Sequence, residues 1–345
     1  MLKASRLARN DTVAIVSLSS GLGGEPAFIH RYEVGKKRLE TEFGLHVVTM
    51  PNAIKGIDYL DYHPEVRAAD LMEAFNNSSI KAIICMIGGD DTIRLLDFID
   101  FDVIKSNPKI FMGYSDTTAN HFMMYKAGLT SFYGPSILTD FAENVKMHDY
   151  TKHCIHNLLF EPSSIFPINP SPLWTSEYLE WADPANNNIA RTMIEDVKGY
   201  ELLQGSGVVQ GRLLGGCVDV FPMIISTTIW PAPNEWNDTI LFMETSEEYP
   251  HPNNVKYILR GLAAQGIIRR INGIVFGKPK DEKYYDEYKQ VLLQVVGKEN
   301  NRGELPILYN VNFGHTAPIC VLPYGVMAEI DCNRTSLCLL ESAVI

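Results

Sequence analysis

Short apolar runs alternate with amphipathic stretches over roughly the first 135 residues of the chain. Runs apolar enough for strands buried on both faces of a parallel sheet are 12–17, 45–50, 81–87, 110–112 and 131–135. Segments whose spacing or composition predicts helices are 28–42, 64–75, 93–98, 119–126 and 148–160. The alternation of the two kinds of segment predicts a right-handed, mostly parallel α/β layer.

The pattern is interrupted after residue 160 and resumes near residue 205. Residues 161–172 are rich in Pro, Ser and Asn, a composition typical of linkers. The later segments predict strands at 207–214, 239–243, 273–277 and 305–310, helices at 215–225, 253–266 and 284–296, and a terminal β-hairpin at 326–340. A chain of 345 residues is too long for one ordinary core. We therefore expect an N-terminal α/β domain over 1–165, a linker and loop over 166–204, and a C-terminal domain over 205–345.

Composition narrows the class of protein. Hydrophobic residues make up 46% and charged residues 21%, as in soluble globular proteins, and the net charge of −11 argues against a nucleic-acid partner. The N-terminus has no long apolar segment, and no apolar run is long enough for a bilayer. The six cysteines are scattered without a C-x-x-C pair, so we expect reduced thiols, a cytoplasmic location and no zinc site.

The first candidate for chemistry is Ser115, in the turn between the predicted strand 110–112 and the predicted helix 119–126. Gly113 ends the strand, and Ser115, Asp116 and the two following threonines have the side chains of a helix N-cap. A nucleophile elbow needs the same layout, because a sharp turn lifts one hydroxyl above the sheet beside backbone N–H groups. On local evidence, a simple helix cap and a catalytic serine both remain open.

Glycine-rich turns follow two earlier strands. Gly88-Gly89 comes directly after 81–87, where backbone amides free of side chains can approach a ligand and form an oxyanion hole. A tight turn without a ligand is the alternative interpretation. The loop 19–24 lacks the dinucleotide spacing, because Pro26 stands where the third glycine should open the helix. We expect neither a cofactor nor a metal.

Glu244 and His315 follow predicted strands of the second half, and Gly314 gives the backbone freedom to aim the imidazole. A nucleophilic serine needs a base, and the base needs a carboxylate to orient it. Each residue also has a plain interpretation, Glu244 as one of several surface acids with Glu247 and Glu248, and His315 as a turn histidine. Trp174 and Trp181 lie in the interrupted region, where aromatic side chains either pack on the protein or stack on a substrate.

Several blocks together are similar to the LD-carboxypeptidase family of serine peptidases. They are Ile87-Gly88-Gly89-Asp90-Asp91, Gly113-Tyr114-Ser115-Asp116-Thr117-Thr118, Leu214-Gly215-Gly216-Cys217, Leu241-Phe242-Met243-Glu244 and Phe313-Gly314-His315-Thr316. The resemblance implies a Ser115–His315–Glu244 triad and an oxyanion hole from backbone N–H groups of Gly88 or Gly89 and of Asp116. It also implies an N-terminal parallel α/β domain (Rossmann- or flavodoxin-like), a C-terminal α/β domain with a mixed or barrel-like sheet, a homodimer and no metal.

Within this family, the chain looks more like the microcin C immunity peptidases than the murein enzymes, because of its Trp174–Trp181 loop and its Ile-Gly-Gly-Asp-Asp turn. The resemblance then implies hydrolysis of an amide between a peptidyl or aminoacyl group and a nucleotide-like moiety, with Trp174 and Trp181 stacking on the substrate. One alternative is a murein tetrapeptide LD-carboxypeptidase that releases terminal D-alanine. The other is a non-catalytic ligand-binding protein on the same fold.

Overall fold

The computed structural model describes all residues 1–345, which form two compact units. The first unit comprises Met1–Pro162, Glu177–Thr192 and Ala343–Ile345, and the second comprises Ser163–Ser176 and Met193–Ser342. The stretch 166–204 therefore contributes to both units. Residues 343–345 join the first unit through the backbone, since Arg6 N donates to Ile345 O (2.8 Å) and Ile345 N donates to Ala4 O (2.9 Å).

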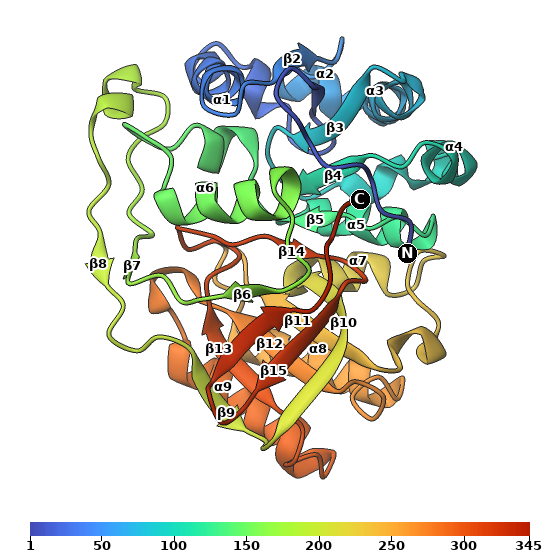
Figure 1. Ribbon diagram of the computed structural model, residues 1–345, viewed down its shortest axis with the longest axis vertical. Helices are drawn as coiled ribbons and strands as arrows, with labels where there is room; N and C mark the ends of the chain where they lie inside the picture. The colour runs from blue at the N-terminus through green and yellow to red at the C-terminus, as the bar shows by residue number, and fades with distance from the viewer. The chain divides into compact units, whose positions relative to one another are not determined.

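The first unit contains a parallel sheet with the strand order β5-β4-β3-β1-β2. Figure 1 labels β2, β3, β4 and β5 of this sheet. Its strands are β1 (Thr12–Val16), β2 (His46–Thr49), β3 (Ile80–Cys85), β4 (Ile110–Gly113) and β5 (Phe132–Tyr133). Its α-helices are α1 (Ile29–Thr41), α2 (Ile57–Tyr62), α3 (Pro64–Asn76), α4 (Phe101–Ser106), α5 (Thr117–Lys126) and α6 (Asp149–Ile155). Every residue of β4 is buried, as the uninterrupted apolar run predicts for a parallel strand.

Short helices of other kinds complete the first unit. They are the 3-10 segments η1 (Leu22–Gly24), η2 (Thr92–Phe98) and η5 (Pro184–Asn188), and the π segments η3 (Ile137–Phe141) and η4 (His156–Phe160). The predicted helix at 93–98 is thus a 3-10 turn. A new helix starts after it because the Asp100 side chain accepts hydrogen bonds from Asp102 N and Val103 N, which caps α4.

The second unit contains a mixed sheet with the strand order β6-β16-β15-β10-β11-β12-β13-β9. These strands are β6 (Phe166–Ile168), β9 (Glu201–Gln204), β10 (Val208–Cys217), β11 (Thr239–Glu244), β12 (Gly273–Gly277), β13 (Ile307–Val311), β15 (Met327–Asp331) and β16 (Ser336–Leu339). Strands β10 to β13 are parallel, and the remaining pairs are antiparallel. The predicted α/β class, with a parallel N-terminal sheet and a mixed C-terminal sheet, is confirmed.

The other elements of the second unit are short strands and connecting helices. The strands are β7 (Leu173–Trp174), which pairs with β8 (Ile194–Glu195), and β14 (Leu322–Pro323). The helices are α7 (Phe221–Ile224), α8 (Pro252–Ala264), α9 (Tyr285–Leu292), the 3-10 segments η6 (Val218–Val220), η7 (Pro233–Trp236) and η8 (Lys280–Glu282), and the π segment η9 (Leu293–Glu299).

The predicted helix at 215–225 is wrong in its first three residues. Gly215, Gly216 and Cys217 continue β10 and pair in parallel with Phe242, Met243 and Glu244 of β11. Pairing with β11 satisfies backbone groups of β10 as far as Cys217, so the two glycines extend the strand and do not end it. Helical structure begins only at Val218.

Candidate active site

Ser115 lies in a sharp turn between the end of β4 and the start of α5. Its φ of 62° is in the left-handed region, which is costly for a residue with a side chain. Its backbone N donates to the hydroxyl oxygen of Tyr133 on the neighbouring strand β5 (3.1 Å), which stabilises the turn. The side chain is partly exposed. This strained strand-to-helix turn has the geometry of a nucleophile elbow.

The Gly88-Gly89 turn packs directly against this elbow. A Cβ atom at Gly88 would lie 2.8 Å from Ser115 Cβ and 3.3 Å from the backbone N of Asp116. A side chain at this position would therefore displace the elbow. The structure thus brings Gly88, Ser115 and the Asp116 amide together within the first unit, and Gly89 follows with its own φ of 154°.

The side chain of Asp116 has a different role from the expected helix cap. It makes no cap hydrogen bond at the start of α5. Its Oδ2 instead accepts hydrogen bonds from Ser19 Oγ (2.6 Å) and Thr92 N (2.9 Å). Ser19 in turn contacts the glycine turn, because a Cβ at Gly89 would lie 2.2 Å from Ser19 Oγ. This buried carboxylate therefore ties the elbow to the loops after β1 and β3.

The buried guanidinium group of Arg67 connects the same two loops, those after β1 and β3. Arg67 donates to the backbone oxygen of Ser19 (2.9 Å) and forms two hydrogen bonds with the carboxylate of Asp91 (2.7 and 3.0 Å). A bidentate pair of this kind fixes both orientation and distance. Sequence reasoning did not single out Ser19, Arg67 or Asp91 for this role, because their pairing depends on the sheet order.

His121, at the centre of α5, has an imidazole close to the elbow. It is fully buried, Nε2 donates to Gly113 O (2.9 Å), and Nδ1 accepts from Ser131 Oγ (2.8 Å). Burial lowers its pKa to about 3, although the bond to Gly113 acts in the opposite direction. His121 is therefore neutral, and its contacts hold the end of β4.

In the second unit, Glu244 and His315 form a close pair. Glu244 is the last residue of β11, and its Oε2 lies 2.8 Å from Nδ1 of His315. The carboxylate is buried (1% exposed), so its interpretation as a surface acid is wrong. Gly314 makes the approach possible. Its φ is 95°, and a Cβ there would lie 2.5 Å from Glu244 Oε2.

His315 has a second carboxylate on its other nitrogen. Nε2 lies 2.9 Å from Oε2 of Glu247, whose side chain is 49% exposed. Burial alone would lower the pKa of His315, but Glu244 and then Glu247 outweigh it and raise the pKa to about 10. Burial would likewise raise the pKa of Glu247, yet His315 lowers it to about 2. The imidazole in this arrangement is a cation at neutral pH.

The structure places the two loop tryptophans in different units. Trp174 belongs to β7 of the second unit, where Nζ of Lys278 lies 4.5 Å from its ring centroid. Trp181 lies in 177–192 of the first unit, and Cζ of Arg31 is 4.3 Å from its ring centroid. Both rings therefore contact cations of the protein itself. Their role in substrate binding stays a prediction.

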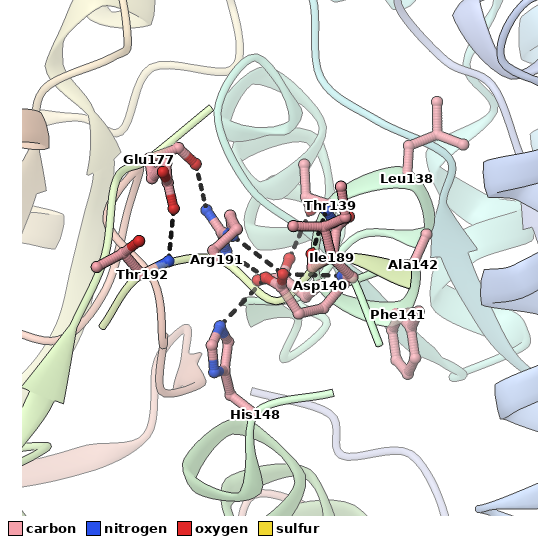
Figure 2. A network of polar contacts seen from close by, with 12 residues as sticks. Leu138, Thr139, Asp140, Phe141, Ala142, His148, Glu177, Ile189, Arg191 and Thr192 are labelled. Carbon is pink, nitrogen blue, oxygen red and sulfur yellow. Dashed lines mark hydrogen bonds and ion pairs between the residues drawn. The ribbon is translucent and has the colours of Figure 1, made fainter. Parts of the chain in front are cut away.

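A polar network holds the segment 177–192 on the first unit. Arg191 and His148 both form ion pairs with the buried carboxylate of Glu143. Figure 2 shows the neighbouring contact, in which Thr192 N donates to Glu177 Oε2 (2.5 Å). Together the basic groups lower the pKa of Glu143 to about 2, although burial acts in the opposite direction. The segment is thus anchored by a charged, buried contact.

No group of three or more His, Cys, Asp or Glu side chains has an arrangement that could hold a metal ion. No helix has the length and apolar character needed to cross a membrane.

Family models match both halves of the chain. The LD-carboxypeptidase N-terminal domain matches residues 13–134, and the LD-carboxypeptidase C-terminal domain matches residues 210–330. The chain belongs to the LD-carboxypeptidase family. This is a family of serine peptidases, so the protein is a hydrolase of that family. Ser115 lies in the first matched segment of the chain, and Glu244 and His315 lie in the second.

The relatives place this chain on the MccF-like branch of the family. The microcin C7 self-immunity protein MccF from Escherichia coli is 29% identical over 350 residues, which cover 99% of this chain and 96% of that protein. The crystal structure of an MccF-like protein from Streptococcus pneumoniae in complex with AMP is 37% identical with a TM-score of 0.88, covering 96% and 98% of the two chains. MccF in complex with aspartyl sulfamoyl adenosine is 26% identical with a TM-score of 0.85, covering 100% of both chains.

Proposed function

We propose that the protein is an MccF-like serine amidase that hydrolyses the amide between an aminoacyl or peptidyl group and a nucleotide-like moiety. Ser115 is the nucleophile, His315 the general base, and Glu244 the carboxylate that orients His315. The observation that carries this proposal is the 2.8 Å pair of Glu244 and His315 in a member of a serine peptidase family. The strained turn at Ser115 supports the assignment of the nucleophile.

The proposed reaction follows the logic of other Ser–His–acid triads. Nε2 of His315 takes the proton of Ser115 as the hydroxyl attacks the substrate carbonyl, and Glu244 stabilises the imidazolium that forms. Backbone N–H groups of Asp116 and of Gly88 or Gly89 stabilise the oxyanion, and each such donor is worth roughly 3 kcal/mol. His315 then protonates the leaving nitrogen, and water hydrolyses the acyl-enzyme.

The substrate class is inferred from the relatives. Their structures hold AMP or an aminoacyl-sulfamoyl nucleoside, which are ligands with a nucleoside part. A murein tetrapeptide, cleaved to release D-alanine, is the second candidate within the same family. A non-catalytic binding protein is disfavoured because Ser115, Glu244 and His315 are all present. From the family resemblance we also expect a homodimer that works in the cytoplasm.

The test is incubation of the purified protein with aspartyl sulfamoyl adenosine and, separately, with a murein tetrapeptide, followed by mass spectrometry of the products. We expect cleavage of the first compound. Ser115→Ala should abolish turnover while the circular dichroism spectrum and the melting temperature stay those of the parent protein. Cleavage of the tetrapeptide alone would overturn the substrate class, and full activity of Ser115→Ala would overturn the triad.

A serine-directed fluorophosphonate separates the enzyme from a binding protein without requiring the substrate. We expect a covalent adduct that peptide mapping places on Ser115 and that is missing in Ser115→Ala. A folded sample that takes up no label would favour the binding protein.

A further inference from the structure

The proposed mechanism needs a free Nε2 on His315, but a carboxylate contacts this nitrogen in the structure. Nε2 of His315 is the atom that must take the serine proton, and it lies 2.9 Å from Oε2 of Glu247. Nδ1 is paired with Glu244 at the same time (2.8 Å). An imidazole between two carboxylates is held as an imidazolium, which has no lone pair to accept a proton. The arrangement is therefore a resting state that must change before catalysis.

The two carboxylates differ in how firmly they are held. Glu244 is 1% exposed at the end of a central strand, beneath Gly314. Glu247 is 49% exposed and lies in the turn after β11. Ser246 fixes this turn, because its N donates to Asp219 Oδ2 (2.9 Å) and its Oγ accepts from Glu248 N (3.2 Å). Rotation of the Glu247 side chain breaks neither bond, so Glu247 is the partner that can leave.

The charges around the pair also favour an incoming cation. Two carboxylates face one imidazolium, which leaves one negative charge uncompensated within the cluster. Other titratable groups that interact with these carboxylates include Lys280 and Tyr249 beside Glu247, and Cys217, Asp219 and Tyr324 beside Glu244. Only Lys280 among them is a cation, so an ammonium group from the substrate would be attracted to the exposed side of Glu247.

We propose that the carboxylate of Glu247 pairs with Nε2 of His315 in the free enzyme. When an aminoacyl substrate binds, this carboxylate leaves Nε2 and pairs with the α-ammonium group of the substrate. The proposal rests on the proposed function and narrows its substrate class. Once Glu247 has moved, the imidazolium loses its Nε2 proton to solvent and becomes the base. In an aminoacyl substrate the ammonium group is one carbon from the scissile carbonyl. The corresponding nitrogen of a murein tetrapeptide is in a peptide bond and has no charge.

The first measurement tests whether Glu247 stabilises the protonated ring of His315, and it needs neither an activity assay nor a ligand. The titration of the His315 ring is followed by NMR with labelled histidine, and the signal is assigned by its loss in His315→Gln. In Glu247→Gln we expect the pKa of His315 to fall by about one unit or more. The matched control is Glu248→Gln, which removes a neighbouring exposed carboxylate and should leave this pKa unchanged. If the pKa of His315 is unchanged in Glu247→Gln, Glu247 does not stabilise the protonated ring and the proposal is overturned.

The second measurement tests the transfer to an ammonium group. Calorimetry in the Ser115→Ala background compares aspartyl sulfamoyl adenosine with its N-acetyl derivative, which lacks the charge. We expect the free amine to bind about tenfold more tightly, and Glu247→Gln to remove most of that preference while Glu248→Gln keeps it. A preference that survives Glu247→Gln, or no binding of either compound, would overturn the transfer. Full turnover by Ser115→Ala would instead count against the triad, and the NMR titration, which uses no ligand, would still report on Glu247.

Discussion

The close approach of Gly314 to Glu244 can be tested by adding a single methyl group at position 314. In Gly314→Ala the new Cβ would lie 2.5 Å from Glu244 Oε2, whereas real Cβ contacts stay above 3.0 Å. The carboxylate must therefore move by at least about 0.5 Å in a closely packed site. That shift disturbs the 2.8 Å hydrogen bond to Nδ1 of His315. A misplacement of about 1 Å can cost roughly a hundredfold in rate, so for a shift of about half that size we expect kcat to fall by about tenfold or more.

The variant also carries backbone strain, which a matched control separates from the steric effect. Gly207 has a φ of 75° in the same unit, and a Cβ there would meet nothing within 4 Å. Gly207→Ala should lose about 1–2 kcal/mol of unfolding free energy from the left-handed backbone, with kcat unchanged. Gly314→Ala should lose a further 1–3 kcal/mol or so from overpacking.

The assay combines urea unfolding with the pH profile of kcat for both variants. We expect the two stability losses to differ and only Gly314→Ala to lose activity. If kcat of Gly314→Ala equals that of Gly207→Ala, the Glu244–His315 distance does not control the reaction, and the role given to Glu244 is refuted. Equal stability losses would show that the turn relaxes without displacing the carboxylate.

Three further results are expected. Ser19→Ala removes one hydrogen bond from the buried Asp116 carboxylate, so kcat should fall about tenfold with KM little changed; an unchanged kcat would contradict a positioning role. The pKa of Glu143 is lowered from 4.5 to about 2, so its contribution of roughly 3 kcal/mol to the free energy of unfolding is present above pH 4.5 and is lost as the pH falls towards 2. Urea unfolding from pH 6 to 2.5 should show this loss of stability, and the loss should be smaller in Arg191→Gln. The pKa of His315 is raised from 6.5 to about 10, so the stability that its protonated ring contributes is present below pH 6.5 and is lost as the pH rises through 10. Urea unfolding from pH 6 to 10.5 should show a decline in the free energy of unfolding, and this decline should be weaker in Glu247→Gln.

Hydrophobic periodicity located most elements because it reports which face of a segment is buried. The run at 110–112 became β4, and the pattern at 64–75 became α3. The same signal does not report which strands are neighbours. Gly215-Gly216-Cys217 therefore looked like a helix start, although pairing with β11 keeps these residues in β10.

The candidate site was predictable in part, for a similar reason. A serine after a strand and a glycine, and a histidine after a glycine, follow a local pattern that a sequence displays. Glu247 was grouped with the surface acids, since nothing in the sequence shows that a half-exposed side chain reaches Nε2 of His315. The contact of Trp181 with Arg31 was equally hidden, because it joins positions 150 residues apart in the chain.

The discontinuity of the first unit bears on how the protein folds during synthesis. Its segments 177–192 and 343–345 are translated after β6 and after β16, respectively. At about 5–20 residues per second, a ribosome needs roughly 10–40 s to proceed from residue 162 to residue 345. Arg191, and with it the Glu143–Arg191 contact, becomes available after roughly 1.5–6 s of that interval, whereas the backbone bonds of Ile345 must wait until its end. The first unit is therefore incomplete until residues 343–345 have been made, although most of its sequence precedes the whole of the second unit.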